Sequence, residues 1–434
     1  MRLDVLIEGH MAGSVEVPSS RRASFAYTAG YLERAHRTPL SVRFPLREDP
    51  YDGPDVASWL WNLLPDDEEV LKRWCIRYGA PPDRPLELLG TVIGRECAGA
   101  VQFAPPEIAP EFLSATGGLQ EITDDELWAG LRRLRGDWSF RFADTHGDAG
   151  RSLAGMQPKD ALAWSGRQWA VPWGRAATTH ILKLERPRFR HEVLVEHVTL
   201  ETARHLGVSA AESRVLSGEE FDVLVVRRFD RRKSAAGEIE RVHQEDFCQA
   251  LGLPPSGRHQ HLGGATVADC AEVVTAFGSS GAANMARLRD SVLFRWLVAD
   301  TDGHAKNAGV LLSGADRALT PLYDAASFLA DRSSTEEREL GIAMWGGEPW
   351  ERWHLGRTDT PEGLGSLTAA LGTADEQVSA RAAEFAAALP AAVDRAVNAL
   401  SGEGQDTLDR LGLVPDLVDR AKRCATVAGS LQGV

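Results

Sequence analysis

Cysteine is scarce in this chain of 434 residues, and the few that occur stand apart from one another. None belongs to a C-x-x-C pair and their number is odd: they are Cys75, Cys97, Cys248, Cys270 and Cys424. A disulfide framework needs an even set, and a thiolate zinc site needs paired cysteines. The sequence therefore argues against both and favours a reducing compartment.

Long apolar runs are also missing. The most apolar stretch, SVLFRWLVAD at 291–300, is interrupted by Arg295 and is too short to span a bilayer. At the N-terminus, Asp4 and Glu8 interrupt the apolar segment that a signal peptide requires. We therefore expect a soluble cytoplasmic protein with no membrane partner.

Basic residues are outnumbered by acidic ones. The chain has 48 Lys and Arg against 62 Asp and Glu, which gives a formal net charge of −14. Nucleic-acid binding depends on cations that neutralise phosphates, so this balance disfavours independent binding to DNA or RNA. The Walker A phosphate loop and a clean G-x-G-x-x-G are absent as well.

What is present divides the chain into three parts. Residues 1–104 begin with short alternating strands, and a Pro-rich stretch follows them. Residues 105–232 alternate loops with apolar strand-like runs around one strong helix that ends at Gly207. Residues 233–434 have mostly helical patterns, with a helix break expected at Pro390. We predict an α+β fold, with a β-rich N-terminal module, a β-rich small lobe and a helical large lobe.

The densest group of polar residues lies in DTDGHAKN at 300–307 and is followed by Asp324 in LYDAAS. Asp302 precedes Asn307 by five residues, the spacing that protein kinases use between the catalytic base and a metal-binding amide. Carboxylate and amide oxygens suit Mg²⁺, so Asn307 and Asp324 are candidate ligands. An isolated D-x4-N is more often a turn, but an acid among apolar residues is costly without a partner. Asp300 competes with Asp302 as the base, and only spacing favours Asp302.

Candidate contacts for a nucleotide lie upstream. Lys183 is in the strand-like run THILKLE, and Glu196, on the helix that follows, is a candidate ion-pair partner. A lone lysine at a strand end is most often a solvated edge charge, and a solvated glutamate is at least as common as a paired one at such a position. GDAGRSLAGMQPKDALAW supplies a glycine-containing turn whose N–H groups can bind phosphate. VVRRFDRR at 225–232 is a candidate hinge beside adenine.

Two other groups of residues are interpreted as structural. His259 and His261 in GRHQHLGG have no matching Cys or acid cluster, so we do not predict a metal site there. The tryptophans of ASWLWNLL have helical spacing and are predicted to be core.

Five segments follow one another along the chain: SLAGMQPKDAL, THILKLE, RVHQEDFCQALGLPPSGRHQ, TDGHAKN and LTPLYDAAS. Together with PLSVRFPLREDPYDGPDVASWLWNLLPDD and GRECAGAVQF nearer the front, they resemble the HipA family of serine/threonine kinases, the toxins of bacterial HipBA-type toxin–antitoxin pairs. The resemblance covers most of the chain, and five ordered motifs are far more specific than one. It implies a protein-kinase-like two-lobe fold with ATP bound between the lobes.

The resemblance also implies a role for each candidate residue. It gives Asp302 as catalytic base, Asn307 and Asp324 as Mg²⁺ ligands, and Lys183 as a contact of the ATP phosphates. The other nucleotide-binding residues that it implies are Ala154, Gly155, Met156, Gln157, Pro158 and Lys159 in the covering loop, Arg227, Arg228 and Phe229 near adenine, and His304, Lys306 and Tyr323 in the pocket.

Ser152 matches a serine that family members autophosphorylate. About two added negative charges in a phosphate-binding loop would repel ATP and inactivate the kinase. The chain departs from the family at Arg227, where many members have an acidic residue. That change matters for adenine binding only if the side chain, and not the backbone, makes the contact.

Partners and alternatives follow from the same resemblance. Known members bind a small helix-turn-helix antitoxin that recognises operator DNA, and they phosphorylate aminoacyl-tRNA synthetases, notably the glutamyl enzyme, which arrests growth. Two alternatives stay open: a non-catalytic corepressor scaffold that keeps the fold, and a small-molecule or lipid kinase with a related site. The intact set of Asp302, Asn307, Asp324 and Lys183 favours an active enzyme over a scaffold.

Overall fold

The structure is a computed structural model that describes residues 1–146, 157–187, 191–330, 341–347 and 353–431. Contacts between residues separate the chain into two units, each described here by itself. Unit 1 consists of Met1–Leu184, Ser217–Pro255 and Val310–Arg317, and unit 2 consists of Glu185–Leu216, Ser256–Gly309 and Ala318–Val434. The division into 1–104, 105–232 and 233–434 stays a prediction.

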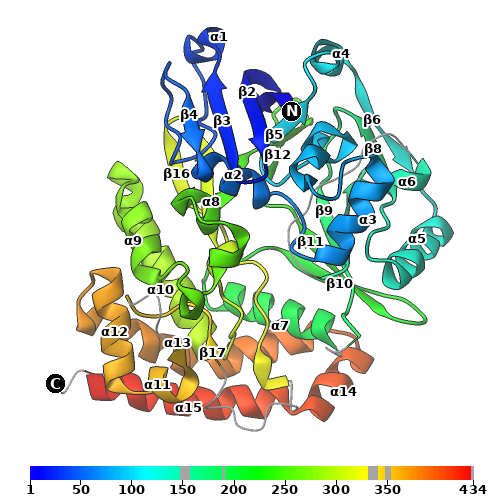
Figure 1. The fold of residues 1–434 in the computed structure, drawn as a ribbon. Helices are drawn as coiled ribbons and strands as arrows, with labels where there is room; N and C mark the ends of the chain where they lie inside the picture. The colour runs from blue at the N-terminus through cyan, green and yellow to red at the C-terminus, as the bar shows by residue number, and fades with distance from the viewer. Residues whose placement is uncertain (147–156, 188–190, 331–340, 348–352, 432–434) are drawn as a thin grey trace. The chain divides into compact units, whose positions relative to one another are not determined.

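Unit 1 begins with a five-stranded antiparallel sheet in the order β4-β3-β2-β1-β5 (Figure 1). Its strands are β1 (Arg2–Ile7), β2 (His10–Ser19), β3 (Arg22–Tyr27), β4 (Tyr51–Gly53) and β5 (Val101–Ala104). Leu3, Val5 and Ile7 alternate along β1 and are fully buried, because alternate side chains of a strand point to the same face. The sheet therefore buries one face of the N-terminal module, as the alternating pattern predicted.

Short helices complete this part of unit 1. They are α1 (Ala29–Leu32), α2 (Pro54–Trp61), α3 (Glu68–Tyr78) and α4 (Ala109–Ser114), with 3-10 helices η1 (Pro85–Gly90) and η2 (Val92–Arg95). Trp59 on α2 is fully buried and Trp61 is partly buried against the same core. The prediction that the tryptophans of ASWLWNLL belong to the core is confirmed.

A second antiparallel sheet of unit 1 carries the predicted nucleotide lysine. Within the unit its order is β11-β9-β7-β8-β6. The strands are β6 (Gly117–Glu121), β7 (Lys159–Trp164), β8 (Trp169–Gly174), β9 (His180–Lys183) and β11 (Asp222–Arg227). Lys183 ends β9 directly opposite Lys159, the first residue of β7. The register therefore brings two lysines together at one end of the sheet.

The remaining elements in the described residues of unit 1 are three helices, a two-stranded ribbon and one further strand. They are the helices α5 (Asp124–Gly136), α6 (Ala143–His146) and α8 (Phe247–Leu251), the ribbon of β12 (Arg231–Lys233) and β13 (Ile239–Arg241), and β14 (His243–Asp246). Among the residues that the structure describes, three strands each contain a boundary between the two units. They are β10 (Ser213–Ser217), β15 (Gly309–Ser313) and β16 (Asp316–Leu319). β14, β15 and β16 pair in that order.

Unit 2 is mostly helical, and α13 lies alongside α15 over most of its length (Figure 1). Its helices are α7 (Glu192–His205), α9 (Val267–Thr275), α10 (Gly281–Leu297), α11 (Leu355–Thr358), α12 (Pro361–Leu371), α13 (Asp375–Asn398), α14 (Gly402–Leu411) and α15 (Leu413–Leu431). Short 3-10 turns are η3 (Pro255–Arg258), η4 (Gln260–Leu262), η5 (Gly278–Ser280), η6 (Ala305–Asn307) and η7 (Phe328–Ala330), and β17 (Gly341–Ile342) pairs with β18 (Trp353–His354). A β-rich N-terminal region and a helical C-terminal region confirm the predicted α+β fold class.

The expected helix break at Pro390 is wrong. α13 runs without interruption from Asp375 to Asn398 with Pro390 inside it. A proline removes one helical hydrogen bond and crowds the preceding turn, so it must be offset by packing. Leu389, Ala392 and Val393 around it are buried, and α13 packs on both α7 and α15. Tertiary contacts therefore override the local preference.

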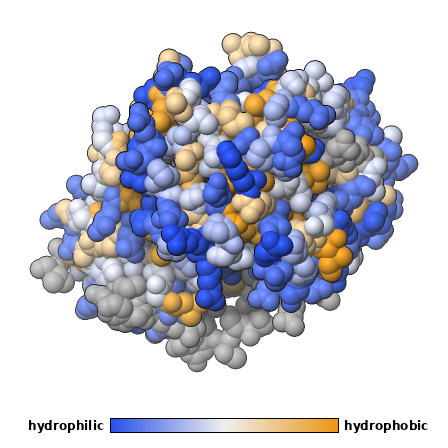
Figure 2. Space-filling model, turned by 45° about the horizontal axis from the view of Figure 1, so that its top comes forward, coloured by the Kyte–Doolittle hydropathy of each residue, from blue (hydrophilic) through white to orange (hydrophobic). Residues whose placement is uncertain are grey.

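The surface drawn in Figure 2 is mostly hydrophilic, and the cysteines form no disulfide among the described residues. Hydrophilic residues predominate on the face drawn in Figure 2, and hydrophobic residues are scattered among them. All five cysteines lie within the described residues, where they are buried and form no disulfide. Among the helices of the described residues, none combines the length and apolar character that crossing a membrane requires.

Candidate active site

The site begins where α10 ends. Ala299 has a left-handed backbone, with φ of 52°, and its N–H donates to the carbonyl oxygen of Trp296 at 3.1 Å. The N–H of Asp300 donates to the carbonyl oxygen of Arg295 at 2.8 Å. This pair of bonds closes the helix sharply in a Schellman arrangement, in which glycine is the usual left-handed residue. The chain therefore turns at once from α10 into the DTDGHAKN loop.

Arg295, on the last turn of α10, binds three separate pieces of this loop region. Its guanidinium pairs with the carboxylate of Asp300. It also donates to the carbonyl oxygens of Asn307 at 3.0 Å, Tyr323 at 2.9 Å and Asp324 at 3.3 Å. The Arg295 side chain is 9% exposed, so these bonds are made away from solvent. One buried cation thus holds together the two segments that carry the predicted acids and amide.

Gly303 allows the loop to lie against Arg295. A Cβ atom at this position would come within 2.5 Å of Cδ of Arg295. Any side chain at 303 would therefore displace the arginine or the loop.

Asp300 and Asp302 have different environments. The Asp300 carboxylate is fully buried, pairs with Arg295, and accepts the N–H of Asp302 at 3.1 Å. The Asp302 side chain is 51% exposed. Asp300 is therefore committed to holding the loop, whereas Asp302 presents its carboxylate to incoming molecules.

The pKa of Asp302 is raised to about 6. The largest cause is the protein packed around this half-exposed side chain, which removes part of the water from the carboxylate, and the negative charges of Asp300 and Asp324 add to it. A base with a pKa near the working pH accepts protons readily and still exists mostly as carboxylate at pH 7. This environment suits a general base.

Asn307 and Asp324 lie beside each other with oxygen atoms suited to a hard cation. The Asn307 amide Nδ2 donates to the carbonyl oxygens of Asp302 at 2.8 Å and Asp324 at 3.5 Å. These bonds direct the amide nitrogen to the backbone and leave Oδ1 as the donor atom for a ligand. Asp324 itself has a left-handed backbone, with φ of 49°, which Asp tolerates better than most residues. An amide oxygen and a carboxylate fit Mg²⁺.

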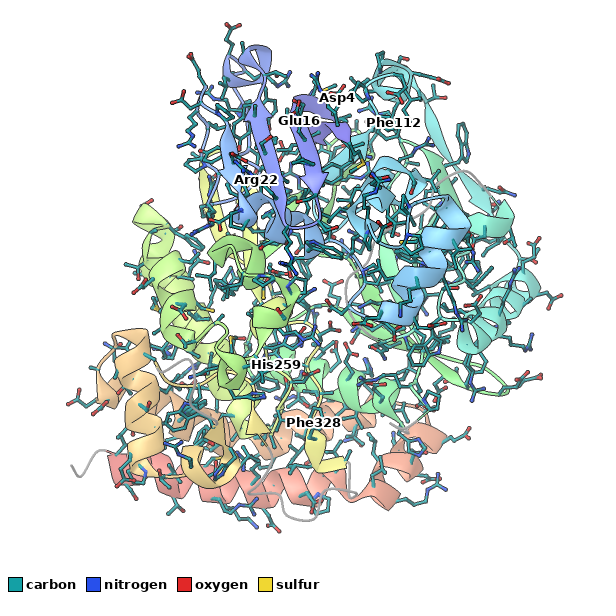
Figure 3. All side chains as sticks on the ribbon, in the orientation of Figure 1. Asp4, Glu16, Arg22, Phe112, His259 and Phe328 are labelled. Carbon is teal, nitrogen blue, oxygen red and sulfur yellow. The ribbon has the colours of Figure 1, made fainter. Side chains whose placement is uncertain are left out.

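The other predicted residues of this loop lie close by. The hydroxyl of Tyr323 donates to the carbonyl oxygen of Lys306 at 2.8 Å, and Lys306 is buried. Nε2 of His304 is 3.9 Å from Oδ1 of Asp302. Figure 3 marks Phe328, whose N–H donates to the carbonyl oxygen of Ala299 at 3.1 Å and ties the segment after Asp324 to the end of α10.

In unit 1, the two lysines that end β9 and begin β7 are both buried. Lys183 is 4% exposed and Lys159 is 8% exposed. Residues directly opposite each other on neighbouring strands project from the same face of the sheet, so the two ammonium groups leave the same face. Gln157 extends this edge and donates from Nε2 to the carbonyl oxygen of Leu184 at 3.0 Å, and Leu184 donates its N–H to Pro158 at 2.9 Å. The arrangement fits a polyphosphate.

Arg228 differs from its two neighbours in the predicted hinge. Its guanidinium is buried and donates to both carboxylate oxygens of Asp230, at 2.9 and 2.7 Å, and to Thr178 at 2.9 Å. Glu96 lies 3.6 Å from the same group. The Arg228 side chain is thus bound within unit 1, so a contact of this residue with adenine would be a backbone contact. Arg227 is exposed and Phe229 is partly exposed.

Several predictions are not tested by this geometry. Ser152, Ala154, Gly155 and Met156 lie outside the described residues. Lys183 belongs to unit 1 and Glu196, buried on α7, to unit 2, so their ion pair stays a prediction.

One residue of the site, and one that lies beside it, were not found from the sequence. In the sequence Arg295 stands out only as an interruption of an apolar run, although a lone arginine in such a run is itself a signal of a buried charge partner. His259 has no matching Cys or acid cluster in the sequence. In the structure its ring is 5.0 Å from that of His304, centroid to centroid.

Comparison with known proteins places this site in a family. Residues 151–393 match the family model of the HipA-like C-terminal domain, and residues 3–104 match that of the HipA N-terminal domain. The chain belongs to the HipA family. Its members include serine/threonine kinases, and this HipA-family chain is accordingly a serine/threonine protein kinase.

Individual relatives agree with this assignment. Y4mE of Sinorhizobium fredii, named as a kinase, is 32% identical over 331 residues, which cover 76% of this chain and 77% of that protein. The serine/threonine-protein kinase toxin HipA of Shewanella oneidensis is 29% identical over 327 residues, 70% of each chain. A solved Shewanella oneidensis structure, of HipA and HipB with their operator DNA, gives a TM-score of 0.81 at 22% identity and covers 100% of this chain and 99% of that one. The fold is therefore the HipA fold.

Proposed function

We propose that this HipA-family kinase transfers the γ-phosphoryl group of ATP to a serine or threonine hydroxyl of a protein, with Asp302 as the base. One observation carries the proposal. The buried guanidinium of Arg295 holds Asp300 and the backbones of Asn307, Tyr323 and Asp324 in one place, and it leaves the Asp302 carboxylate accessible.

Each residue then has a chemical task. Asp302 orients the attacking hydroxyl and accepts its proton at a carboxylate oxygen. Asn307 Oδ1 and the Asp324 carboxylate would hold Mg²⁺, which when bound neutralises charge on the phosphates. Lys183, with Lys159 beside it, contributes positive charge for the phosphates. His304, Lys306 and Tyr323 complete the pocket.

The biological role is proposed from the relatives. The Shewanella relative is named a toxin, and its solved structure contains HipB and operator DNA. We propose that this chain likewise acts in the cytoplasm as a toxin restrained by a small helix-turn-helix antitoxin, through which it reaches operator DNA. Its net charge of −14 agrees with an indirect route to DNA. Its substrate is proposed to be a translation component, an aminoacyl-tRNA synthetase such as the glutamyl enzyme.

The base is tested by replacing Asp302 with Asn. We expect phosphate transfer from radiolabelled ATP to fall by at least about 10²-fold, the usual contribution of a positioned base, while the affinity for Mg·ATP is kept. Asp409→Asn, an exposed change on α14, is the matched control and should transfer phosphate normally. Transfer at the wild-type rate by the Asp302 variant would contradict the assignment of Asp302 as the base. If the wild type phosphorylated only small molecules and no protein, the small-molecule kinase alternative would be favoured.

The regulatory part of the proposal concerns Ser152. Incubation with Mg²⁺ and ATP should add one phosphate at Ser152 and then lower ATP affinity, because the added charge repels the nucleotide. Intact-mass and peptide spectrometry measure both the number and the position of phosphates. An unmodified Ser152, under conditions where ATP binds, would contradict autophosphorylation without touching the assignment of Asp302.

A further inference from the structure

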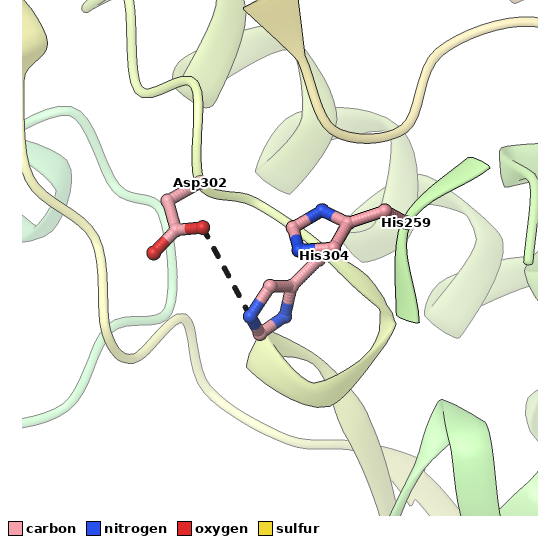
Figure 4. A group of neighbouring side chains, drawn as sticks. All are labelled: His259, Asp302 and His304. Atoms are coloured by element: carbon pink, nitrogen blue, oxygen red, sulfur yellow. Dashed lines mark ion pairs between the residues drawn. The ribbon is translucent and has the colours of Figure 1, made fainter. Parts of the chain in front are cut away.

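Three side chains with metal-binding atoms converge beside the proposed catalytic loop. His259 comes from the segment between η3 and η4, and Asp302 and His304 come from the loop after α10 (Figure 4). One ligand atom from each lies within 4.8 Å of the others. Oδ1 of Asp302 is 3.9 Å from Nε2 of His304, and the two imidazole rings are perpendicular, at 83°. All three residues belong to unit 2.

His304 offers a ring nitrogen that the rest of the protein does not use. The residue is mostly buried, and its Nδ1 has no hydrogen-bond partner among the described residues. His259 is half-buried beside it, with the two ring centroids 5.0 Å apart. A metal ion would supply the partner that the His304 imidazole lacks.

The type of ligand selects the type of metal. Mg²⁺ prefers an all-oxygen set, such as Asn307 and Asp324, whereas two imidazoles and a carboxylate suit Zn²⁺. Zinc–nitrogen bonds of about 2.0–2.1 Å in a tetrahedron put ligand atoms roughly 3.4 Å apart. The 3.9 Å separation of Asp302 and His304 closes to that distance by a small rotation, and the exposed Asp302 side chain is free to make it.

One neighbour competes with a metal. Nε of Arg258 donates to Nε2 of His259 at 3.2 Å, so Zn²⁺ either uses the other ring nitrogen or displaces this donor. Two other neighbours favour a metal. The negative charges of Asp300 and Asp324 lie near Asp302 and attract a cation to its carboxylate.

We propose that His259, Asp302 and His304 form a Zn²⁺ site that inhibits the kinase by occupying its catalytic carboxylate. A carboxylate bound to Zn²⁺ shares its negative charge with the metal, which makes it a much weaker acceptor for the proton of a substrate hydroxyl. The site is distinct from the Mg²⁺ ligands Asn307 and Asp324. Its inhibitory effect rests on the proposed role of Asp302 as base, but the binding of Zn²⁺ does not.

Zinc binding is measured directly by calorimetry with ZnCl₂ on the full chain. His259→Gln should weaken Zn²⁺ binding by at least about tenfold, because at other metal sites the loss of a group that only supports a ligand already costs about 10–100-fold. His261→Gln is the matched control, because its exposed ring lies 5.6 Å from that of His259 and is not one of the three ligands. Equal affinity in the wild type and His259→Gln would overturn the proposed site.

Activity separates the two proposals. With saturating Mg·ATP and no zinc, His259→Gln should transfer phosphate as the wild type does, and added Zn²⁺ should inhibit the wild type and His261→Gln but not His259→Gln. Equal inhibition of all three would contradict the inference and leave the kinase assignment intact. If Asp302→Asn lost Zn²⁺ affinity but kept phosphate transfer, the metal site would stand, whereas its inhibitory action and the assigned base would both fail.

Discussion

At the scale of residues, one arginine determines which of two neighbouring acids is buried and which is exposed. Asp300 and Asp302 are chemically identical and nearly adjacent, yet the first is buried against Arg295 and the second is half exposed. Because a buried carboxylate needs a partner, Asp300 is held in place, and its neighbour is left for chemistry.

The pH dependence follows from the raised pKa of Asp302. Below about pH 6 this carboxylate becomes protonated and cannot accept the hydroxyl proton, so the rate of phosphate transfer should fall about tenfold per pH unit. Above that pH the rate should level off. Values of kcat/KM for Mg·ATP between about pH 5 and 8 report the free enzyme and therefore measure this. A rate of phosphate transfer that rises as the pH falls would contradict the role of Asp302 as base.

Removing the charge of Arg295 should destabilise the protein. Arg295→Met leaves Asp300 buried without its partner, and breaking a buried pair in this way costs about 3–5 kcal/mol of unfolding free energy. Urea unfolding provides the value. The double variant Arg295→Met/Asp300→Asn removes both charges and should recover part of the loss. Equal stability of the wild type and the single variant would show that the pair does not hold the loop.

Much of the site could be predicted from the sequence, because Asp302, Asn307 and Asp324 are marked by spacing and by an acid among apolar residues. Arg295 and His259 could not be found in that way. Their partners lie on other segments, and periodicity reports which face a residue occupies but not which distant group it meets.

At the scale of elements, packing decides where helices bend and end. α10 closes through a left-handed alanine, a conformation that costs roughly 1–2 kcal/mol for a residue with a Cβ. α13 continues through Pro390 because its apolar face is buried on both sides of the proline. The sequence pattern predicted the existence of these helices, whereas tertiary contacts determined their limits.

Replacing Pro390 by Ala should stabilise the protein. The change restores the missing N–H, which can donate to the carbonyl oxygen of Ala386, and removes the clash with that turn, effects worth up to about 3 kcal/mol in a helix interior. Pro361→Ala is the control. Pro361 is the first residue of α12, where the N–H has no helical partner, so the free energy of unfolding should change little. A lower melting temperature for Pro390→Ala than for Pro361→Ala would contradict this account of α13.

At the scale of the whole molecule, the family assignment extends over both the N-terminal domain and the kinase domain. Composition excluded several classes of protein, and ordered motifs gave the family. Neither identifies a substrate, because recognition of a protein depends on a surface and not on the catalytic loop.

Induced expression in a bacterial host tests the cellular role. The wild type should arrest growth and Asp302→Asn should not, since arrest is proposed to need phosphate transfer. A phosphoproteome that compares the two should contain an aminoacyl-tRNA synthetase modified only by the wild type. Arrest of equal strength by both proteins would favour a binding mechanism over an enzymatic one.

The central claim is that Asn307 and Asp324 hold the metal of a nucleotide beside Asp302. Anomalous diffraction from crystals grown with Mn²⁺, in place of Mg²⁺, and a non-hydrolysable ATP analogue tests it most directly. We predict a manganese peak within coordination distance of Asn307 Oδ1 and an Asp324 carboxylate oxygen, with the γ-phosphate of the analogue facing Asp302. A peak at other residues, with the nucleotide bound away from this loop, would contradict the account.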